Sequence, residues 1–452
     1  MSKTRKRVLF GASTFLGIAI ISFSVYLNAV LPIITGYAAK NLCSAVFVSG
    51  RMPVDVEAVD LNFSFIKYTN NEVNYNEQSV TSHFLWGKSK AIYREGFGST
   101  LLRDIPEEKL RKTRFPVSIK PGYSQDTIAW PLGDILPDTK TGINLSALGE
   151  ITKRLINDNA YNGNAFAFMV LHKGIPVAEG YKKHFNKNTR LLSWSMAKSF
   201  TNAMVGILVR QGKMDINQTT DLEVWKGDDR SKITLNNLMQ MQSGLKWNEA
   251  YGNRSDVTVM LHSESDMSRY AFERPLEYPA GTHWYYSSGT CNIVNYLIRR
   301  QFNSDSLYYS FVNTQLFNKI GMPDAVFEVD PTGTIIGSSY LYATARDYAR
   351  FALLYQDDGV FNGERILPEG WVQYSTSSAS ASNEKYGSFF WLNKGKALPS
   401  APEDMYSCDG HDGQHIFIMP TQELIVVVLG YSPKSKVGMD FDRLLKDILN
   451  TL

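Results

Sequence analysis

The sequence predicts a mixed α/β fold of the α+β kind, in which one antiparallel sheet is assembled from both ends of a domain around a mainly helical insertion. The first observation is a hairpin pattern over residues 165–182, with its turn at Lys173-Gly174. The second is a pair of alternating apolar segments, 414–419 and 423–429, separated by a short turn. The third is helical periodicity in the long segment between them. Strands at both ends with helices between favour one shared sheet.

The helical segments are recognised by apolar residues at helical spacing and by residues that begin or end helices. Thr344, with Asp347 three residues later, has the spacing of a capping box, with aspartate in place of the usual glutamate. Glycines that follow several of these segments are typical of helix ends. On this basis the sequence predicts helices over residues 144–160, 193–212, 234–243, 288–302, 306–319, 345–356 and 441–449.

The N-terminus begins with basic residues and continues into Val8–Ala39, which contains no charged residue. About 20 apolar residues are enough to cross a bilayer as a helix. We therefore expect residues 1–40 to be a cytoplasmic basic stub and a transmembrane anchor, with the rest of the chain periplasmic or extracellular. The alternative is a cleaved signal peptide, because Gly36-Tyr37-Ala38 has the small-x-small pattern of a cleavage site. The long apolar run favours the single-pass anchor.

The remainder divides into an N-terminal extension, residues 41–125, and a larger domain, residues 126–452, that carries the recognisable chemistry. Within the extension, residues 80–102 are predicted to form two strands about Gly87-Lys88, and the polar residues 68–78 a loop. No motif in the extension indicates a chemical role, so a packing function is expected there.

Composition excludes several classes of protein. The 452 residues carry 47 Lys and Arg against 44 Asp and Glu, a net charge of +3, so no nucleic-acid partner is expected. Hydrophobic residues make up 44% and charged residues 20%, as in globular domains. Cys43, Cys291 and Cys408 form no CxxC motif, and the seven histidines have no metal-ligand spacing, so neither a metal nor another cofactor is expected. The sequence does not determine the oligomeric state.

The centre of the predicted chemistry is Ser195, with Lys198 three residues later at the start of the helix over 193–212. Residues three apart share one face of a helix, so the hydroxyl and the amine should meet. A neighbouring base is what makes a serine nucleophilic at neutral pH. The same Ser-x-x-Lys spacing also occurs at Ser64, Ser243 and Ser382, so the motif depends on its context.

A tyrosine provides the second element. Tyr286 follows a Pro-Ala-Gly turn and precedes a predicted helix, where its phenol could face Ser195 and Lys198. A positive charge beside a phenol lowers the phenol's pKa, so Lys198 and Tyr286 could share a proton relay. The alternative is that Tyr286, one of 24 tyrosines, only fills the edge of a core.

The third element is Gly410-His411-Asp412-Gly413-Gln414, directly before a predicted strand. Glycine at a strand edge permits a ligand to approach the backbone closely. The N–H of Gln414 and that of Ser195 could form an oxyanion hole, and His411 could orient or bind substrate. An isolated histidine is more often structural, and that alternative applies to His411.

These three elements, in this order, resemble those of the serine β-lactamase and penicillin-binding-protein superfamily, and more narrowly those of class C β-lactamase-related hydrolases. The resemblance covers about residues 145–450, and the phrases LSWSMAKSFTNAMVG and LMQMQSGLKWNE are most similar to the 6-aminohexanoate-dimer hydrolase branch. It implies a β-lactamase/transpeptidase-like fold. It also implies Ser195 as the acylated nucleophile, Lys198 as proton acceptor and Tyr286 as the base that serves leaving group and water.

The resemblance also implies substrate-binding roles. In that branch an additional tyrosine on a mobile loop helps to bind amide substrates, and Tyr251 is the candidate here. Ser288 stands where the family commonly has asparagine, and His411-Asp412-Gly413 stands where it has Lys-Thr-Gly. These two departures disfavour efficient β-lactam hydrolysis and favour ester or linear amide hydrolysis. We expect Ser288, Tyr251, His411 and Gly413 to contact a small-molecule or short-peptide substrate.

The sequence leaves three alternative functions to be compared. The first is a membrane-anchored serine hydrolase of the esterase or amidase type that forms a Ser195 acyl-enzyme. The second is a penicillin-binding D,D-carboxypeptidase-like enzyme or a β-lactamase. The third is a binding protein whose hydrolase domain is silent, which the retention of Ser195, Lys198 and Tyr286 disfavours.

Overall fold

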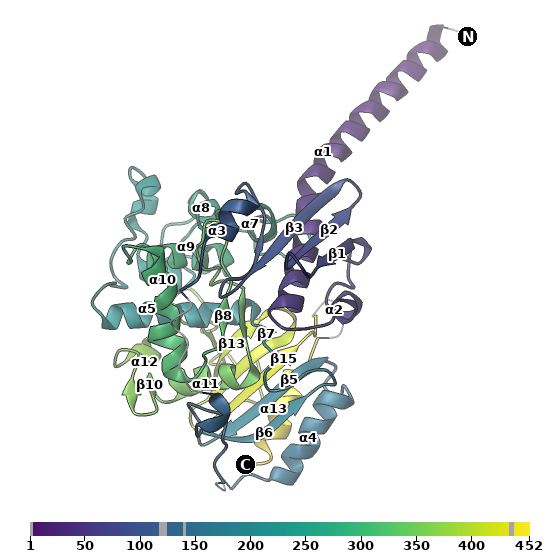
Figure 1. The fold of residues 1–452 in the computed structure, drawn as a ribbon. Helices are drawn as coiled ribbons and strands as arrows, with labels where there is room; N and C mark the ends of the chain where they lie inside the picture. The colour runs from purple at the N-terminus through teal and green to yellow at the C-terminus, as the bar shows by residue number, and fades with distance from the viewer. Residues whose placement is uncertain (1–2, 117–123, 139–141, 434–437) are drawn as a thin grey trace.

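The structure, a computed structural model, describes residues 3–116, 124–138, 142–433 and 438–452 (Figure 1). Its central feature is an antiparallel six-stranded sheet of order β12-β13-β14-β15-β5-β6. The predicted sheet from both ends of the domain is confirmed, since two strands precede the helical insertion and four follow it. The strands are β5 Ala165–His172, β6 Ile175–Tyr181, β12 Trp391–Leu392, β13 Tyr406–Gly410, β14 Gln414–Met419 and β15 Leu424–Gly430.

Helices cover both faces of this sheet. One face packs against α4 (Leu145–Asn157) and α13 (Phe441–Leu449), with the side chains of Leu148 and Leu445 fully buried there. The other packs against α11 (Ala345–Gln356), which begins with the predicted capping box of Thr344 and Asp347. Burial of one apolar stripe of each helix against an apolar sheet face stabilises this layered arrangement.

The helical insertion contains helices that the sequence did not predict, among them α7 and α8. Both are short, and α7 is capped by Ser255 and Thr258 rather than by the usual glutamate or glutamine at the third position. The helices here are α5 Ala197–Arg210, α6 Leu235–Met239, α7 Asp256–Ser263, α8 Met267–Phe272, α9 Ser288–Arg299 and α10 Asp305–Val312. The smaller elements are α2 Pro53–Val59, α3 Glu107–Lys112, α12 Trp371–Ser375, β7 Leu191–Leu192, β8 Val326–Phe327, β9 Leu341–Ala343, β10 Val360–Phe361 and β11 Glu364–Arg365.

The N-terminal extension forms its own antiparallel sheet of four strands, β1 Asn70–Asn74, β2 Ser79–Phe84, β3 Gly87–Arg94 and β4 Gly98–Leu101. The prediction of a loop over 68–78 was therefore wrong, and the two strands predicted over 80–102 are three. The cause is that β1 reads Asn-Asn-Glu-Val-Asn, a polar edge strand that pairs only with β2 and shows no apolar alternation.

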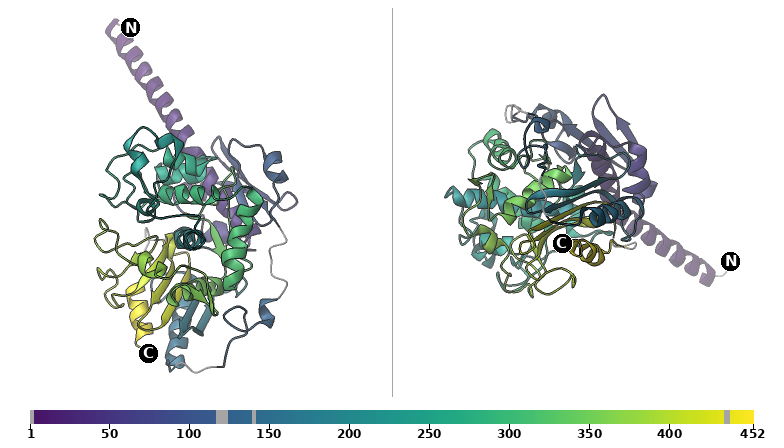
Figure 2. Two further views of the ribbon diagram at one scale, coloured as in Figure 1. Left: turned by 90° about the vertical axis from the view of Figure 1, so that its left-hand side faces the viewer. Right: turned by 90° about the horizontal axis from the view of Figure 1, so that it is seen from below.

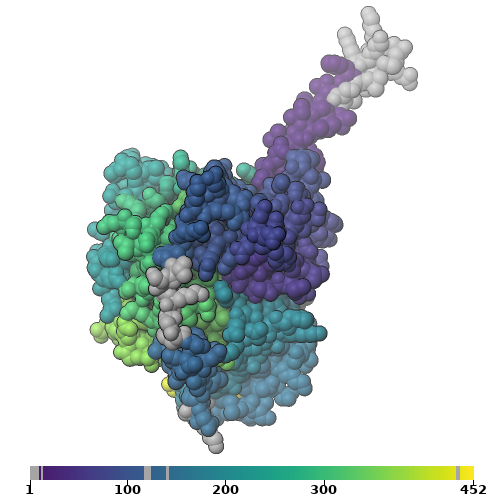
Figure 3. Space-filling model, viewed as in Figure 1, coloured from purple at the N-terminus to yellow at the C-terminus, as the bar shows by residue number. Residues whose placement is uncertain are grey.

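The longest element is α1, which runs unbroken from Lys3 to Phe47 (Figures 1 and 2). Its part over Thr14–Phe47 is long and apolar enough to cross a membrane. Side chains described between Phe10 and Ala29 are mostly exposed, whereas Leu31, Ala38 and Leu42 are at most 1% exposed. The first part thus stands clear of the body (Figure 3) and the second belongs to the core. The boundary proposed at residue 40 falls inside this helix.

The buried part of α1 is joined to the catalytic domain by an ion pair. Lys40 pairs with Glu328, and both side chains are at most 2% exposed. The carboxylate of Glu328 also accepts hydrogen bonds from the hydroxyl of Ser44, at 2.8 Å, and from the backbone N–H of Ser99 in β4, at 2.6 Å. Because a buried charge requires partners for every lone pair, these contacts fix how α1, β4 and the catalytic domain meet.

Removal of one partner of this pair should destabilise the whole protein. Lys40→Met leaves the Glu328 carboxylate buried without its cation, and we expect a loss of about 3–5 kcal/mol in the free energy of unfolding. The double variant Lys40→Met/Glu328→Leu removes both charges and should recover much of that loss. The measurement is denaturant unfolding of the full chain in detergent micelles.

The matched control for this experiment is Lys112→Ala, because Lys112 forms an ion pair with Glu108 in which both side chains are largely exposed. That substitution should leave the unfolding midpoint essentially unchanged. If Lys40→Met had the same unfolding midpoint as the control, the Lys40–Glu328 ion pair would not stabilise the contact between α1 and the catalytic domain.

Candidate active site

Ser195 lies in a tight turn between β7 and α5. Residues Trp194–Met196 form a single 3₁₀ turn that leads directly into Ala197–Arg210. Trp194 has a φ of 45°, in the left-handed region that bulky residues rarely adopt. This sharp turn places the Ser195 hydroxyl at the N-terminal end of α5, where free backbone N–H groups and the helix dipole favour negative charge.

Lys198 is buried at 1% exposure, and its amine has three neighbours. Its Nζ atom lies 2.9 Å from Ser195 Oγ, 3.1 Å from Ser288 Oγ and 2.9 Å from the carbonyl oxygen of Ser338. A carbonyl can only accept, and the Ser288 hydroxyl already donates to a carboxylate oxygen of Glu249, at 2.5 Å. The Ser195 hydroxyl is therefore the neighbour that can donate to the lone pair of a neutral Lys198 amine.

The surroundings lower the pKa of the Lys198 amine. Burial away from water is the main cause, because it disfavours the charged form. The negative charge of Glu249 acts in the opposite direction and limits the decrease. A lysine with a lowered pKa can be a neutral base at a pH where an ordinary lysine stays protonated.

Tyr286 lies beside this pair, as predicted, on the loop before α9. Its phenol is hydrogen-bonded to Ser195, and the Lys198 amine lies 4.8 Å from the centre of its ring. The ring also stacks on Trp391, with centroids 5.3 Å apart. The expected lowering of the tyrosine's pKa was wrong: burial raises the pKa of Tyr286 well above its ordinary value. Its phenol is therefore protonated at neutral pH and can donate a proton.

Glu249 is a site residue that the sequence analysis did not identify. Its carboxylate accepts hydrogen bonds from the Ser288 N–H at 2.9 Å, from the Trp247 indole at 2.5 Å and from the Tyr251 hydroxyl at 3.3 Å. Glu249 directly follows Trp247-Asn248, and these residues form no catalytic motif from which its role could be predicted. Only the fold shows that it joins the start of α9 to the loop that carries Tyr251.

Tyr251 and His411 meet across the site. Their rings stack with centroids 4.6 Å apart. The His411 ring also makes a T-shaped contact with the Trp194 ring, with centroids 5.6 Å apart. His411 also lies 3.3 Å from the carboxylate of Asp412. The imidazole is thus held between the nucleophile turn and the Tyr251 loop, so both predicted residues reach the site.

Three predicted residues have other surroundings. Ser288 is fully buried and its hydroxyl is hydrogen-bonded to Lys198 and Glu249, while its expected contact with substrate stays a prediction. A Cβ atom added at Gly413 would lie 2.9 Å from the Cβ of Ser432, which follows the end of β15. The side-chain amide of Gln414 bonds both backbone groups of Gly430 in β15.

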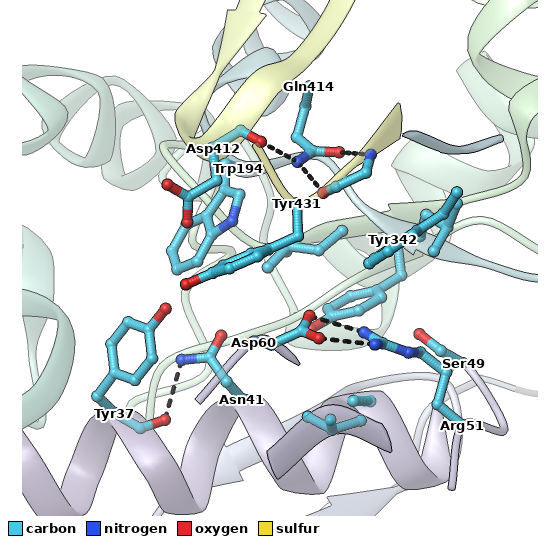
Figure 4. Close-up of a pocket in the computed structure, with 16 residues that line it drawn as sticks. Tyr37, Asn41, Ser49, Arg51, Asp60, Trp194, Tyr342, Asp412, Gln414 and Tyr431 are labelled. Atoms are coloured by element: carbon cyan, nitrogen blue, oxygen red, sulfur yellow. Dashed lines mark hydrogen bonds and ion pairs between the residues drawn. The ribbon is translucent and has the colours of Figure 1, made fainter. Parts of the chain in front are cut away.

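Several of the predicted site residues line one cavity of about 460 Å³. Ser195, Tyr286, Tyr251 and His411 all line it, whereas Gly413 and Gln414 do not. Gln414 lines instead a small neighbouring cavity of about 50 Å³, shown in Figure 4, which shares Tyr37, Asp412 and Tyr431 with the larger one. The backbone of Gln414 pairs with Gly410 where β13 and β14 meet, and the oxyanion-hole role expected of its N–H stays a prediction.

No group of three or more metal-ligating side chains occurs among the described residues. Cys43, Cys291 and Cys408 are all buried free thiols. The reactive groups that the structure brings together are the serine hydroxyl, the lysine amine and the tyrosine phenol.

Comparison with known proteins identifies the family to which this chain belongs. The Beta-lactamase family model matches residues 155–449. The 6-aminohexanoate-dimer hydrolase of Paenarthrobacter ureafaciens is 26% identical over 298 residues, which cover 59% of this chain and 72% of that protein.

Solved structures share the fold. A Bacillus anthracis protein assigned as a 6-aminohexanoate-dimer hydrolase matches with a TM-score of 0.54 and 22% identity, over 75% of this chain and 86% of that one. A penicillin-binding protein homologue from Caulobacter crescentus matches with a TM-score of 0.54 and 15% identity, over 70% and 98% of the two chains. This chain belongs to the Beta-lactamase family of the serine β-lactamase and penicillin-binding-protein superfamily and has its β-lactamase/transpeptidase-like fold.

Proposed function

We propose that this protein is a membrane-anchored serine hydrolase that cleaves ester or linear amide bonds through an acyl-enzyme on Ser195. The observation that carries the proposal is the 2.9 Å contact between Ser195 Oγ and the buried Lys198 amine, whose pKa is lowered. Membership of a hydrolase family supports the same chemistry.

In the proposed acylation step, neutral Lys198 takes the proton of Ser195 as Oγ attacks the substrate carbonyl. The developing oxyanion is stabilised by the Ser195 N–H at the start of α5. A second donor is proposed on the His411 N–H in place of that of Gln414. In support, Gly410 packs its backbone against the Ser193 carbonyl, and Gly410 and His411 both line the cavity.

Tyr286 is proposed to protonate the leaving group. Its phenol holds a proton at neutral pH and is hydrogen-bonded to Ser195, so it lies next to the bond that breaks. The alcohol or amine leaves with that proton, and Lys198 supplies the replacement. The reverse transfers activate the water that releases the acid and restores Ser195.

The surroundings of Ser288 favour esters and linear amides over β-lactams. In the family pattern an asparagine stands at this place and contacts the substrate, but here the hydroxyl is held by Lys198 and Glu249. The relative from Paenarthrobacter ureafaciens is named for hydrolysis of a linear amide dimer. Tyr251, beside His411 in the cavity, is the proposed contact for the leaving amide of a small-molecule or short-peptide substrate.

An uncleaved anchor is proposed for α1, with the N-terminus cytoplasmic and residues 41–125 and 126–452 on the far side of the membrane. Cleavage after Ala38 would remove Ile34 and Ala38 itself from the core that they share with β2 to β4, and with them the buried Leu31. Gly36 packs so closely against Arg103 and the His262 carbonyl that any side chain there would collide with them. A segment with these contacts is more suited to permanent retention.

The central test is covalent labelling. A fluorophosphonate should modify Ser195, identified by peptide mass spectrometry, and Ser195→Ala should lower turnover of 4-nitrophenyl butyrate by at least about 10³-fold. The control is Ser199→Ala on the same helix, which lies outside the cavity. A folded protein that is neither labelled nor active would support the silent binding protein, and a stable penicillin adduct on Ser195 would support the penicillin-binding alternative.

The depressed pKa of Lys198 predicts the direction of the pH dependence. The protonated amine cannot accept the serine proton, so kcat/KM is low at acid pH and rises as the amine loses its proton. Because burial lowers this pKa, the midpoint of the rise should lie below that of an ordinary lysine. Lys198→Arg, which stays protonated, should lower kcat/KM by about 10²–10⁴-fold. A rate that does not vary between pH 5 and 10 would contradict this role.

Glu249→Gln tests how the carboxylate acts through the lysine. The negative charge raises the pKa of Lys198, so its removal should move the acid limb of the kcat/KM profile to lower pH. Glutamine keeps the shape and most hydrogen bonds, so a merely structural role would change the rate without moving that limb. The matched control is Glu223→Gln, whose side chain is 83% exposed and should leave the profile in place.

A further inference from the structure

The cavity at Ser195 is not closed by the catalytic domain alone. Ser195, Tyr286 and the Tyr251 loop line it together with α1 and the segment after α2. We call the apolar end the part lined by Tyr26, Val30 and Ile34 of α1 and by Phe63 and Phe65. The reacting groups therefore share one cavity with a mostly apolar part built from the helix that carries the candidate membrane-spanning sequence.

The position of the bilayer along α1 follows from length and charge. The last basic residue before the apolar run is Arg7, and the exposed part ends near Ala29, after which the side chains are buried. The apolar helical segment from the residue after Arg7 to Ala29, about 22 residues or about 33 Å, matches the thickness of one hydrocarbon core, about 30 Å. The far surface of the membrane then lies at the level of Tyr26 and Val30, the residues that line the cavity.

Exposed aromatic residues support this level. Trp86, at the tip of the β2–β3 hairpin, is 59% exposed and its indole donates to the Asn28 side chain at 2.7 Å. The neighbouring Leu85 is 63% exposed. The hairpin points along α1 toward its N-terminal part (Figure 1). Tryptophan beside a membrane helix is typical of the interface between hydrocarbon and water.

The cavity reaches the surface at this same level. Tyr26 and Phe65 both line it, and they are 56% and 59% exposed. Phe65 packs against Phe84 at the base of the hairpin tip, with ring centroids 6.2 Å apart. An apolar chain could therefore pass from the bilayer to the space beside Ser195 along apolar side chains, without being transferred through water.

The helix also contacts the nucleophile turn itself. Tyr37 of α1 stacks on Trp194 at 6.3 Å and packs against His262 at 5.3 Å, and it points toward Trp194 in Figure 4. Because Trp194 precedes Ser195, the membrane helix is part of the scaffold that positions the nucleophile. The apolar end and the reactive end thus form one continuous site.

From these observations we infer that the substrate is an acyl ester or acyl amide of a membrane lipid, taken directly from the bilayer. Its hydrocarbon chain occupies the end lined by Val30, Ile34 and Phe65, and its carbonyl lies at Ser195. This inference rests on the proposed serine hydrolase function. Ser195 Oγ bonds to the acyl carbon as the C–O or C–N bond breaks, and the lipid alcohol or amine leaves with a proton. Water then releases the fatty acid and restores the serine.

The test uses the full chain reconstituted into phosphatidylcholine vesicles. It compares 4-nitrophenyl butyrate with 4-nitrophenyl palmitate, and it measures release of labelled fatty acid from acyl-labelled phosphatidylcholine in the same vesicles. The wild-type kcat/KM should be at least ten-fold higher for palmitate than for butyrate, and mass spectrometry should find a long-chain acyl group on Ser195. Val30→Trp, which fills the apolar end, should lower the palmitate-to-butyrate ratio at least ten-fold.

The matched control is Val25→Trp, on the same helix but 65% exposed and not lining the cavity. It should leave the palmitate-to-butyrate ratio unchanged. Turnover of butyrate without any preference for palmitate, or equal ratios in the two tryptophan variants, would overturn the lipid inference while the serine hydrolase proposal stood. Absence of turnover and labelling with every ester would instead overturn the proposed function.

Discussion

The proposed chemistry depends on removing one amine from water. Three separate segments surround Lys198: the nucleophile turn, the start of α9 at Ser288, and the carbonyl of Ser338. The same enclosure lowers the pKa of the amine and holds it 2.9 Å from Ser195 Oγ. In the proposed mechanism, a change that let water reach this amine would raise its pKa and loosen its position, so packing and reactivity form one constraint.

The second constraint is the docking of α1. The buried half of this helix contributes to the core of the extension, pairs Lys40 with Glu328, and places Tyr37 against Trp194. The apolar first part of α1 is long enough to cross a membrane, and the helix continues without a break for several turns inside the protein. If the proposed anchor is correct, helix geometry rather than a flexible linker fixes the distance between bilayer and nucleophile.

Sequence patterns predicted the site unevenly. Ser195 and Lys198 were accessible because their interaction is local, three residues apart on one helical turn. The direction of the Tyr286 pKa shift was wrong, because a neighbouring charge was assumed to dominate whereas burial does. Gln414 was assigned to the oxyanion hole from its place before a strand, but local sequence could not show that its side chain bonds Gly430 and that it does not line the Ser195 cavity. Glu249 was missed because its partners, Ser288 and Tyr251, belong to different elements.

The sequence by itself determined the elements with strong local patterns: the hairpin of β5 and β6, the capping box of α11, the apolar α1 and the Ser-x-x-Lys turn. Such features depend on neighbours within a few residues, so their physics is contained in short segments. The tertiary structure alone decided which residues share the cavity, how far α1 enters the core, and that an apolar wall faces Ser195. Those properties depend on burial and on contacts between residues far apart in the chain, which no local pattern records.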